Sequence, residues 1–275
     1  MSSLDSTWSP ADNPHAIAVS EAQWWFRSAM LTGLRIHGED DCRVGFSSRQ
    51  IDARQLVVAL WQLRLAEKLQ QHALRELGVD LTVIAALSRA RTSFDKVMPG
   101  LRHMRDGMLH FDEWTRGTGA GPQRKAVVAG TAPREVAAEY SRFGYDPATD
   151  EVTFGPYTFE VTAALDAARG LADAIYTAAC AVDLRNAAAL RTRTAEVLRS
   201  AELGGAAGRA TRVVLAADTR VWVSLENSAE PDRGLVAERV VEALTAANLR
   251  LVSSREPQSE DWAERLENGE ALFVE

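Results

Sequence analysis

Hydrophobic residues recur every three or four positions through most of the N-terminal three quarters of the chain, which is the spacing of amphipathic helices. The pattern predicts a first helix that starts near Glu21, a second over 51–77 and a third over 80–97. The third is expected to begin at Asp80, because a short carboxylate side chain is a good N-cap. Residues 1–13 are rich in Ser, Asp, Pro and Asn, and we expect them to be disordered.

A fourth amphipathic segment follows Pro99. Proline ends one helix and can open the next, because the first turn does not need its missing N–H. We expect this helix to run over 99–116, where the glycines of RGTGAGP break it. The aromatic, alternating stretch that follows, with its Asp-Pro turn, predicts a β-hairpin with strands over 138–144 and 151–160.

The Ala-rich stretch over 161–203 predicts a long last helix, with a break expected near 183–186. Gly204, Gly205 and Gly208 then mark the expected domain boundary. Beyond them the pattern favours a strand or short helix, a strand, an amphipathic helix and two short strands.

Together these elements predict a mainly α fold, with two parts. The first is a helical bundle over 14–203 that carries an inserted β-hairpin at about 138–160. The second is a small C-terminal α/β appendage over 209–275, in which no catalytic constellation is apparent.

Composition and charge narrow the class of protein. No run reaches the roughly 18 apolar residues of a membrane helix, and the N-terminus has neither a basic start nor an apolar stretch, so we expect a cytoplasmic protein. Cys42 and Cys180 lie far apart without metal-type neighbours, which agrees with a reducing compartment. The formal net charge of -7 argues against a protein that coats nucleic acid through bulk electrostatics, but it leaves room for a local basic cleft.

The segment LRHMRDGMLHFDEW carries the most legible chemistry of the chain. Its apolar residues would form one stripe of a helix: Leu101, Met104, Met108 and Phe111. Polar side chains occupy the opposite face between Arg105 and His110, which lie about 140° apart at 100° per residue. This face also holds Arg102, His103, Asp106 and Glu113.

Arg105, Asp106 and His110 follow the pattern of an arginine, a polar residue, three further residues and a histidine. On a helix of a mainly α protein, this pattern resembles the HEPN superfamily, whose R(N/D/H)xxxH signature lies on a helix of an all-α bundle. The resemblance extends over about residues 21–203, with the hairpin as an insertion. One toxin branch of the superfamily has a tyrosine two residues after the histidine; Asp112 stands there in this chain, so chemistry that depends on that tyrosine is not carried over.

The resemblance implies a metal-independent endoribonuclease that needs no cofactor and acts as a homodimer through this helix. In such an enzyme the ribose 2′-OH attacks the adjacent phosphate. His110 would move the protons, Arg105 would neutralise the phosphate, and Asp106 would orient His110 or the arginine of the facing copy. RNA is then the expected substrate. A bacterial toxin or defence role, with an antitoxin or another regulatory partner, is the implied setting.

A metal site is a second interpretation of the same face. Four potential ligands are spaced i, i+3, i+7 and i+10: His103, Asp106, His110 and Glu113. Metal sites in helical bundles usually draw ligands from several helices, for which the candidates are Glu21, Asp52 and Glu67.

Two non-catalytic interpretations also fit. Arg105 could pair with Asp112, and Asp106 with His110, as ordinary surface or interface contacts. Alternatively, the chain is a helical adaptor or regulator that kept the fold without the activity, with the appendage at 209–275 as its binding module.

Overall fold

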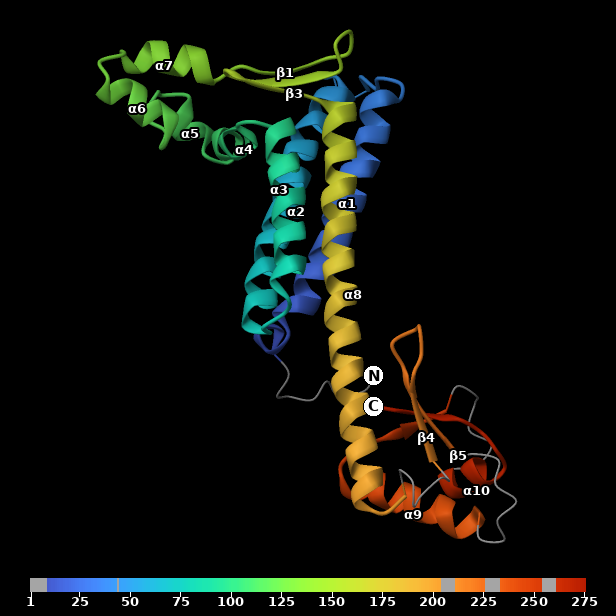
Figure 1. Cartoon of the computed structure of the whole chain (residues 1–275). Coiled ribbons are helices and arrows are strands. Elements are labelled where there is room, and N and C mark those ends of the chain that lie inside the picture. The colour runs from blue at the N-terminus through green and yellow to red at the C-terminus, as the bar shows by residue number, and fades with distance from the viewer. Residues whose placement is uncertain (1–8, 44, 204–210, 226–232, 254–260) are drawn as a thin grey trace. The chain divides into compact units, whose positions relative to one another are not determined.

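The computed structural model of the chain describes residues 9–43, 45–203, 211–225, 233–253 and 261–275. Helices dominate these residues, and their strands form two small antiparallel sheets, which confirms the predicted mainly α fold class (Figure 1). The chain divides into two compact units, Met1–Ala179 and Cys180–Glu275. The expected boundary at the glycines between 204 and 208 lies outside the described residues.

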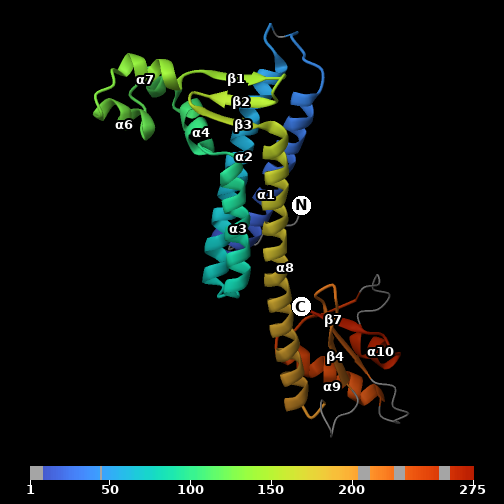
Figure 2. The same cartoon turned by 45° about the horizontal axis from the view of Figure 1, so that its top comes forward.

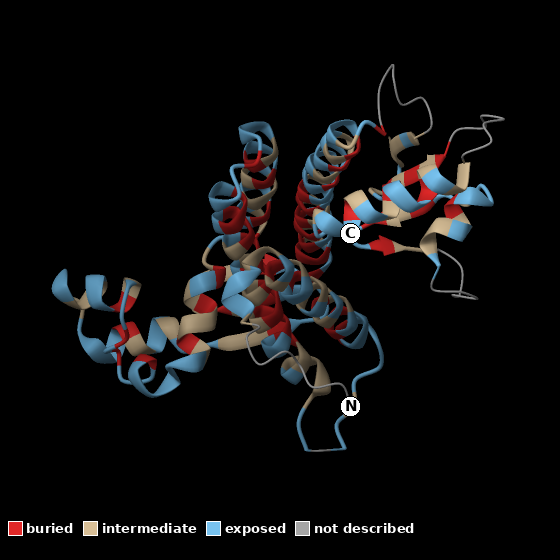
Figure 3. Cartoon of the chain, turned by 90° about the horizontal axis from the view of Figure 1, so that it is seen from below, coloured by how far each residue is buried: buried red, intermediate tan, exposed pale blue. Residues whose placement is uncertain are grey.

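Long helices that lie side by side form the body of the first unit (Figure 1 and Figure 2). They are α1 (Pro14–His37), α2 (Ser48–Glu76), α3 (Leu81–Val97) and the start of α8 (Val161–Ser200). Buried residues, red in the cartoon of Figure 3, follow the inner faces of these helices. The fully buried apolar side chains include Ile36, Leu56, Leu60, Leu63, Leu87, Phe94, Leu171 and Ile175. Removing these side chains from water is the main force that holds the bundle together.

The first helix begins earlier than the sequence predicts. The side chain of Asn13 accepts a hydrogen bond from the backbone N–H of Ala16 at 3.1 Å, and Pro14 occupies the first turn. Residues 10–12 form a short 3-10 turn, so the prediction of disorder is wrong for residues 9–13. Residues 1–8, to which the same prediction applies, lie outside the described part of the chain.

The third helix matches its prediction. Asp80 caps α3, and its carboxylate accepts a hydrogen bond from the backbone N–H of Thr82 at 2.7 Å. The helix ends at Val97, two residues before Pro99.

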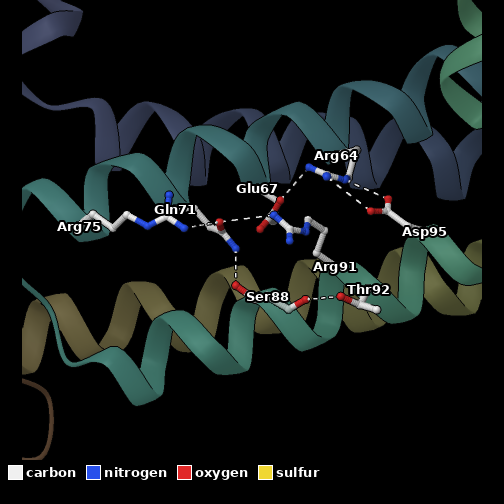
Figure 4. A network of polar contacts seen from close by, with 8 residues as sticks. All are labelled: Arg64, Glu67, Gln71, Arg75, Ser88, Arg91, Thr92 and Asp95. Carbon is white, nitrogen blue, oxygen red and sulfur yellow. Dashed lines mark hydrogen bonds and ion pairs between the residues drawn. The ribbon is translucent and has the colours of Figure 1, made fainter.

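A partly buried polar seam joins α2 to α3 (Figure 4). Glu67 of α2 is fully buried, and its Oε2 accepts a hydrogen bond from Arg64 at 2.9 Å. Arg64 also donates from Nε to Asp95 of α3 at 3.0 Å, and Gln71 donates to Ser88 of α3 at 2.7 Å. Glu67 Oε1 has no hydrogen-bond partner among the described residues, and burial raises the pKa of this carboxyl to about 7.

The inserted β structure is a three-stranded meander, not the predicted hairpin. Its strands are β1 (Phe143–Asp146), β2 (Glu151–Phe154) and β3 (Tyr157–Glu160), in the order β1-β2-β3. The predicted strand over 151–160 is divided because Gly155 turns the chain with a φ of 57°, a conformation that favours glycine. The predicted strand over 138–144 starts too early, since residues up to Tyr140 are helical.

Two side chains fasten this sheet to the bundle. Gln50 of α2 pairs with the backbone of Tyr145 through both ends of its carboxamide, at 2.7 and 2.9 Å. Asp150, in the turn between β1 and β2, contacts His37 of α1 at 2.9 Å. The same carboxylate accepts hydrogen bonds from the hydroxyl of Tyr145 at 3.0 Å and from the backbone N–H of Thr162 at the start of α8 at 3.0 Å.

The prediction of one continuous fourth helix over 99–116 is wrong. The helix divides at His110 into α4 (Leu101–Leu109) and α5 (Phe111–Trp114). The break folds Trp114 back over Gly107, so closely that a Cβ added at Gly107 would lie 2.9 Å from the indole ring. In a straight helix the two residues, seven positions apart, would be separated by about 10 Å along the axis. Phe111, expected on the apolar stripe, is consequently exposed.

Two short helices that the sequence analysis did not predict follow α5: α6 (Pro122–Val128) and α7 (Pro133–Tyr140). Each has a proline in its first turn. Their few apolar positions leave little periodicity to detect, and within these two helices only Gln123 of α6 and Val136 of α7 are buried.

The last long helix, α8, is continuous over 40 residues, and the predicted break near 183–186 is wrong. Residues 183–186 continue the helix because this stretch contains neither proline nor glycine, the residues that most often interrupt a helix. Like every other helix in the described residues, α8 lacks the apolar length needed to cross a membrane.

The second unit contains the end of α8 and a four-stranded antiparallel sheet in the order β4-β5-β7-β6. Its elements are β4 (Thr211–Leu215), β5 (Val221–Leu225), α9 (Arg233–Ala246), β6 (Leu251–Val252), α10 (Trp262–Glu267) and β7 (Leu272–Val274). One face of the sheet packs with α9, α10 and α8 around a core that includes Leu198, Val223, Val240, Leu266 and Leu272. The predicted strands and helix are confirmed, whereas α10 was not predicted.

Candidate functional site

The polar face of α4 borders a surface hollow of about 430 Å³. The residues that line it include the whole predicted polar strip together with part of the loop that precedes α6: Arg102, His103, Arg105, Asp106, His110, Glu113, Trp114, Ala120 and Gly121. The three predicted catalytic residues, Arg105, Asp106 and His110, therefore border one cavity.

Arg105 is held firmly on α4. Its Nη1 lies 2.8 Å from Asp106 Oδ1, and its guanidinium carbon lies 5.0 Å from the centre of the Trp61 ring on α2. The side chain is 22% exposed, and its Nε is buried without a hydrogen-bond partner among the described residues. The sequence could not indicate this stacking because Trp61 precedes Arg105 by more than 40 positions.

Asp106 is a partner of arginines in this structure. Besides Arg105, it contacts Arg102 one turn earlier, with Nε and Oδ2 3.5 Å apart. Its backbone carbonyl, but not its carboxylate, accepts a hydrogen bond from the N–H of His110 at 2.9 Å. The suggested pairing of the Asp106 side chain with His110 is therefore not what the structure shows.

His110 lies at the break between α4 and α5. Its backbone has left helical geometry, with a φ of -112° and a ψ of 41°. The residue is exposed, and its imidazole makes no hydrogen bond with any residue that the structure describes. The ring is thus free to meet a ligand at the mouth of the hollow.

His103 is the more enclosed of the two histidines. Its ring stacks on that of Tyr157 from β3, with ring centres 5.3 Å apart and planes inclined by 27°. Burial lowers the pKa of His103 below its ordinary value, although the nearby carboxylate of Asp106 opposes the shift. The neutral imidazole is therefore favoured at neutral pH. Tyr157 was not a predicted site residue, because only the folded sheet brings it near α4.

Packing around Trp114 fixes the shape of the hollow. Trp114 is 3% exposed and contacts the rings of Tyr140 and Phe154. Gln123 of α6 is fully buried; it donates a hydrogen bond to the carbonyl of Trp114 at 3.0 Å and accepts one from the N–H of Gly119 at 2.7 Å. These bonds hold the loop between α5 and α6 beside α4.

The metal interpretation finds no geometric support. Within the described parts of the chain, no three His, Cys, Asp or Glu side chains gather as a metal site requires. The proposed ligands from other helices have other contacts: Glu21 accepts a hydrogen bond from Trp25, Asp52 lies near Arg35, and Glu67 belongs to the seam with α3.

The hollow thus combines two arginine side chains, two imidazoles and two carboxylates on one open surface. Such a set can bind a phosphate through guanidinium groups and transfer protons near neutral pH. No protein-family model, curated protein or solved structure matches the chain.

Proposed function

We propose that the chain is a metal-independent endoribonuclease that cleaves RNA at the hollow beside α4. The observation that carries the proposal is that Arg105, Asp106 and His110 border one cavity, together with Arg102 and His103. The cavity offers cations for the phosphate and imidazoles for proton transfer, which are the groups that this reaction requires.

The proposed reaction begins when His110 removes the proton from a ribose 2′-OH. The resulting oxygen attacks the adjacent phosphorus, the bond from phosphorus to the 5′-oxygen of the next nucleotide breaks, and a proton from a second imidazole or from water completes the leaving hydroxyl. Arg105 and Arg102 stabilise the negative charge on the phosphate oxygens. The products are a 2′,3′-cyclic phosphate, or the 3′-phosphate formed from it by hydrolysis, and a 5′-hydroxyl.

Asp106 has a positioning role in this proposal. Its carboxylate lies between the two guanidinium groups, at 2.8 Å from Arg105 and 3.5 Å from Arg102. Such an arrangement restricts the rotamers of both long side chains, and arginines that are already ordered lose less entropy when they bind a phosphate.

The proposal includes a homodimer formed around α4. Leu109 and Phe111 flank His110 and are 58% and 69% exposed. A second copy would cover these apolar side chains and bring a second imidazole to the phosphate. A toxin or defence role in the cytoplasm, with an antitoxin or regulator, is part of the same proposal.

The deciding experiment is incubation of the purified full chain with total RNA, with and without EDTA, followed by mapping of the cut ends. We expect cleavage that survives EDTA and leaves 2′,3′-cyclic phosphate or 3′-phosphate ends. Activity that EDTA abolishes and manganese restores would favour a metal enzyme instead.

A non-catalytic adaptor is the second candidate, and one observation favours it. Arg105 is already engaged by Asp106 and Trp61, as an arginine with a purely structural role would be. RNA that stays intact at every enzyme concentration, with no inhibitory partner present, would establish this candidate over the ribonuclease.

A further inference from the structure

One face of the four-stranded sheet in the second unit is turned away from the helices. Residues that alternate along β5 show this: Val221, Val223 and Leu225 are buried, whereas Trp222 and Ser224 are half-buried. Strand register places the neighbours of Trp222 on the same face, because directly opposed residues of an antiparallel pair project to one side. We call this side the open face; its residues on the four strands are Arg212, Val214, Trp222, Ser224, Val252 and Phe273.

An apolar row crosses the open face. Trp222 of β5 lies opposite Val214 of β4 and Phe273 of β7, and Phe273 lies opposite Val252 of β6. The rings of Trp222 and Phe273 meet edge to face, with centres 5.5 Å apart. Among the described residues, neither ring belongs to the core that packs with α8, α9 and α10. The row is therefore a surface feature and not part of that core.

Arginines surround the aromatic pair. The guanidinium carbon of Arg220 lies 5.1 Å from the centre of the Phe273 ring, and its Nε lies 3.5 Å from Asp218. Arg212 is exposed and lies opposite Ser224. Arg250 is exposed and exchanges backbone hydrogen bonds with Glu275 at the edge of the face. Three arginines therefore lie beside the two aromatic rings; Asp218 offsets the charge of Arg220 and Glu275 lies opposite Arg250, which leaves Arg212 as the cation of this face without an acidic neighbour in the strand ladder.

We propose that the open face binds single-stranded RNA. Every base has a π-face that stacks on an aromatic ring, and the backbone carries one negative charge per nucleotide. Trp222 and Phe273 would stack bases, while Arg212, Arg220 and Arg250 would contact phosphates. The choice of RNA over DNA rests on the proposed ribonuclease function. The proposal that the face stacks bases of a single strand does not depend on that function.

The position of the row favours a nucleic acid over a peptide that would extend the sheet. A peptide that extends a sheet binds at the backbone groups of an edge strand. Trp222 and Phe273 instead lie on the face of the two central strands, β5 and β7. A duplex is also disfavoured, because its bases are already stacked on one another and cannot reach the rings.

The test is binding of a fluorescein-labelled oligouridylate of about 12 nucleotides, a length in the range of single-strand sites. The protein is the full chain with His110→Ala, which is expected to slow cleavage during the measurement. Fluorescence anisotropy is recorded for this parent and for the same chain with Trp222→Ala added. We expect Trp222→Ala to weaken binding about 5- to 150-fold, the usual effect of losing one stacked base.

Two controls match the variants. Trp24→Ala removes another surface tryptophan, 71% exposed on α1, and is expected to bind like the parent. Arg212→Gln should lower the slope of log affinity against log salt by about 0.7, the value for one phosphate contact of a single strand, whereas Arg199→Gln on α8 should leave it unchanged.

A loss of binding through misfolding is separated from a loss of stacking by two further measurements. Trp222→Phe keeps an aromatic ring and should retain most of the affinity. Ultraviolet crosslinking of the parent should attach the oligonucleotide to peptides that contain Trp222 or Phe273.

The proposal is overturned if Trp222→Ala and Arg212→Gln both bind like the parent, or if a duplex of equal length binds as well as the single strand. Tight binding of an extended peptide with no binding of RNA would assign the face to a protein partner. The ribonuclease proposal is tested separately, by cleavage with the wild-type chain. If that chain cuts no RNA but binding of the oligouridylate still depends on Trp222, only the catalytic proposal fails. If an oligodeoxythymidylate binds as tightly as the oligouridylate, the open face has no preference for RNA.

Discussion

His110 and Arg105 differ in how far the fold depends on them. His110 is exposed, whereas Arg105 stacks on Trp61 and pairs with Asp106. We expect His110→Ala to reduce cleavage about 100- to 10,000-fold while changing the free energy of unfolding by no more than about 0.5 kcal/mol. Single-turnover kinetics and thermal denaturation measure the two effects. A rate close to wild type would remove His110 from the chemistry.

Arg105→Ala is expected to affect both quantities. The loss of a cation that stabilises the phosphate should again lower the cleavage rate by at least about 100-fold. The loss of packing on Trp61 should also cost about 1 to 2 kcal/mol of stability. From the helical pattern alone, Arg105 lies off the apolar stripe, so the sequence predicts no stability effect. Equal melting temperatures for Arg105→Ala and wild type would favour that simpler prediction.

His103 offers a contrast with His110 in the same hollow. Its ring stacks on Tyr157, and burial lowers its pKa. Because the folded-state pKa is depressed, the neutral ring stabilises the fold above about pH 6.5, and this contribution is lost as the pH falls through the folded pKa. His103→Ala should therefore change cleavage far less than His110→Ala and should reduce the loss of stability on acidification. Unfolding at pH 5 and pH 8 tests this; an unchanged pH dependence would contradict it.

Among the elements, α4 depends on a glycine that the helical pattern does not explain. A Cβ at Gly107 would lie 2.3 Å from the Phe154 ring, which is too close without movement of the core. We expect Gly107→Ala to destabilise the protein by about 1 to 3 kcal/mol. Gly170 on α8 is the matched control, since a Cβ there meets nothing within 4 Å and Gly170→Ala should stabilise the helix by up to about 1 kcal/mol. Urea denaturation compares the two; equal midpoints would contradict the packing argument.

The seam between α2 and α3 makes stability depend on pH. Burial raises the pKa of Glu67 to about 7, above its ordinary value near 4.5. Because the folded-state pKa is raised, the Glu67 carboxyl contributes to the stability of the fold below about pH 4.5, and this contribution is lost as the pH rises through about 7. Glu67→Gln should therefore be more stable than wild type at pH 8, by on the order of 2 kcal/mol, with a smaller difference at pH 5. Chemical denaturation at both pH values measures the difference.

Asp95→Asn is the control for this seam, because Asp95 also contacts Arg64 but is 48% exposed. It should change stability little and at both pH values alike. If Glu67→Gln were less stable than wild type by the same amount at pH 5 and pH 8, its carboxyl would be ionised throughout and paired with Arg64.

Periodicity located the long helices, although it placed the start of α1 too late and predicted a break in α8 that is absent; it failed where tertiary contacts decide. The third helix, with Asp80 as its cap, could be predicted because local chemistry sets its start. The break at His110 could not, since it depends on Trp114 packing against Phe154 and Gly107. The candidate residues on α4 were found from a helical wheel, whereas Trp61 and Tyr157 come from distant segments. Stacking across segments leaves no periodic signal along the chain.

At the scale of the whole molecule, the proposed homodimer links the exposed surface at the junction of α4 and α5 to activity. Leu109 and Phe111 are exposed on either side of His110, an arrangement that a second copy would bury. Phe111→Asp introduces a charge into this surface without altering Arg105 or His110. We expect it to shift the protein from dimer to monomer in sedimentation velocity and to lower cleavage in proportion, because a buried unpaired charge strongly opposes association.

Trp24→Asp is the control for the dimer, since Trp24 is equally exposed but lies on α1. It should remain dimeric and active. The dependence of rate on protein concentration supplies a second measurement: for a dimeric enzyme, the specific activity of wild type should fall on dilution below the dissociation constant, and Phe111→Asp should regain activity at high concentration.

A wild-type chain that sediments as a monomer at concentrations where it cleaves RNA fully would show that one copy of the hollow suffices. In that case the second imidazole would have to be sought within the same chain, with His103 as the first candidate because it borders the same cavity.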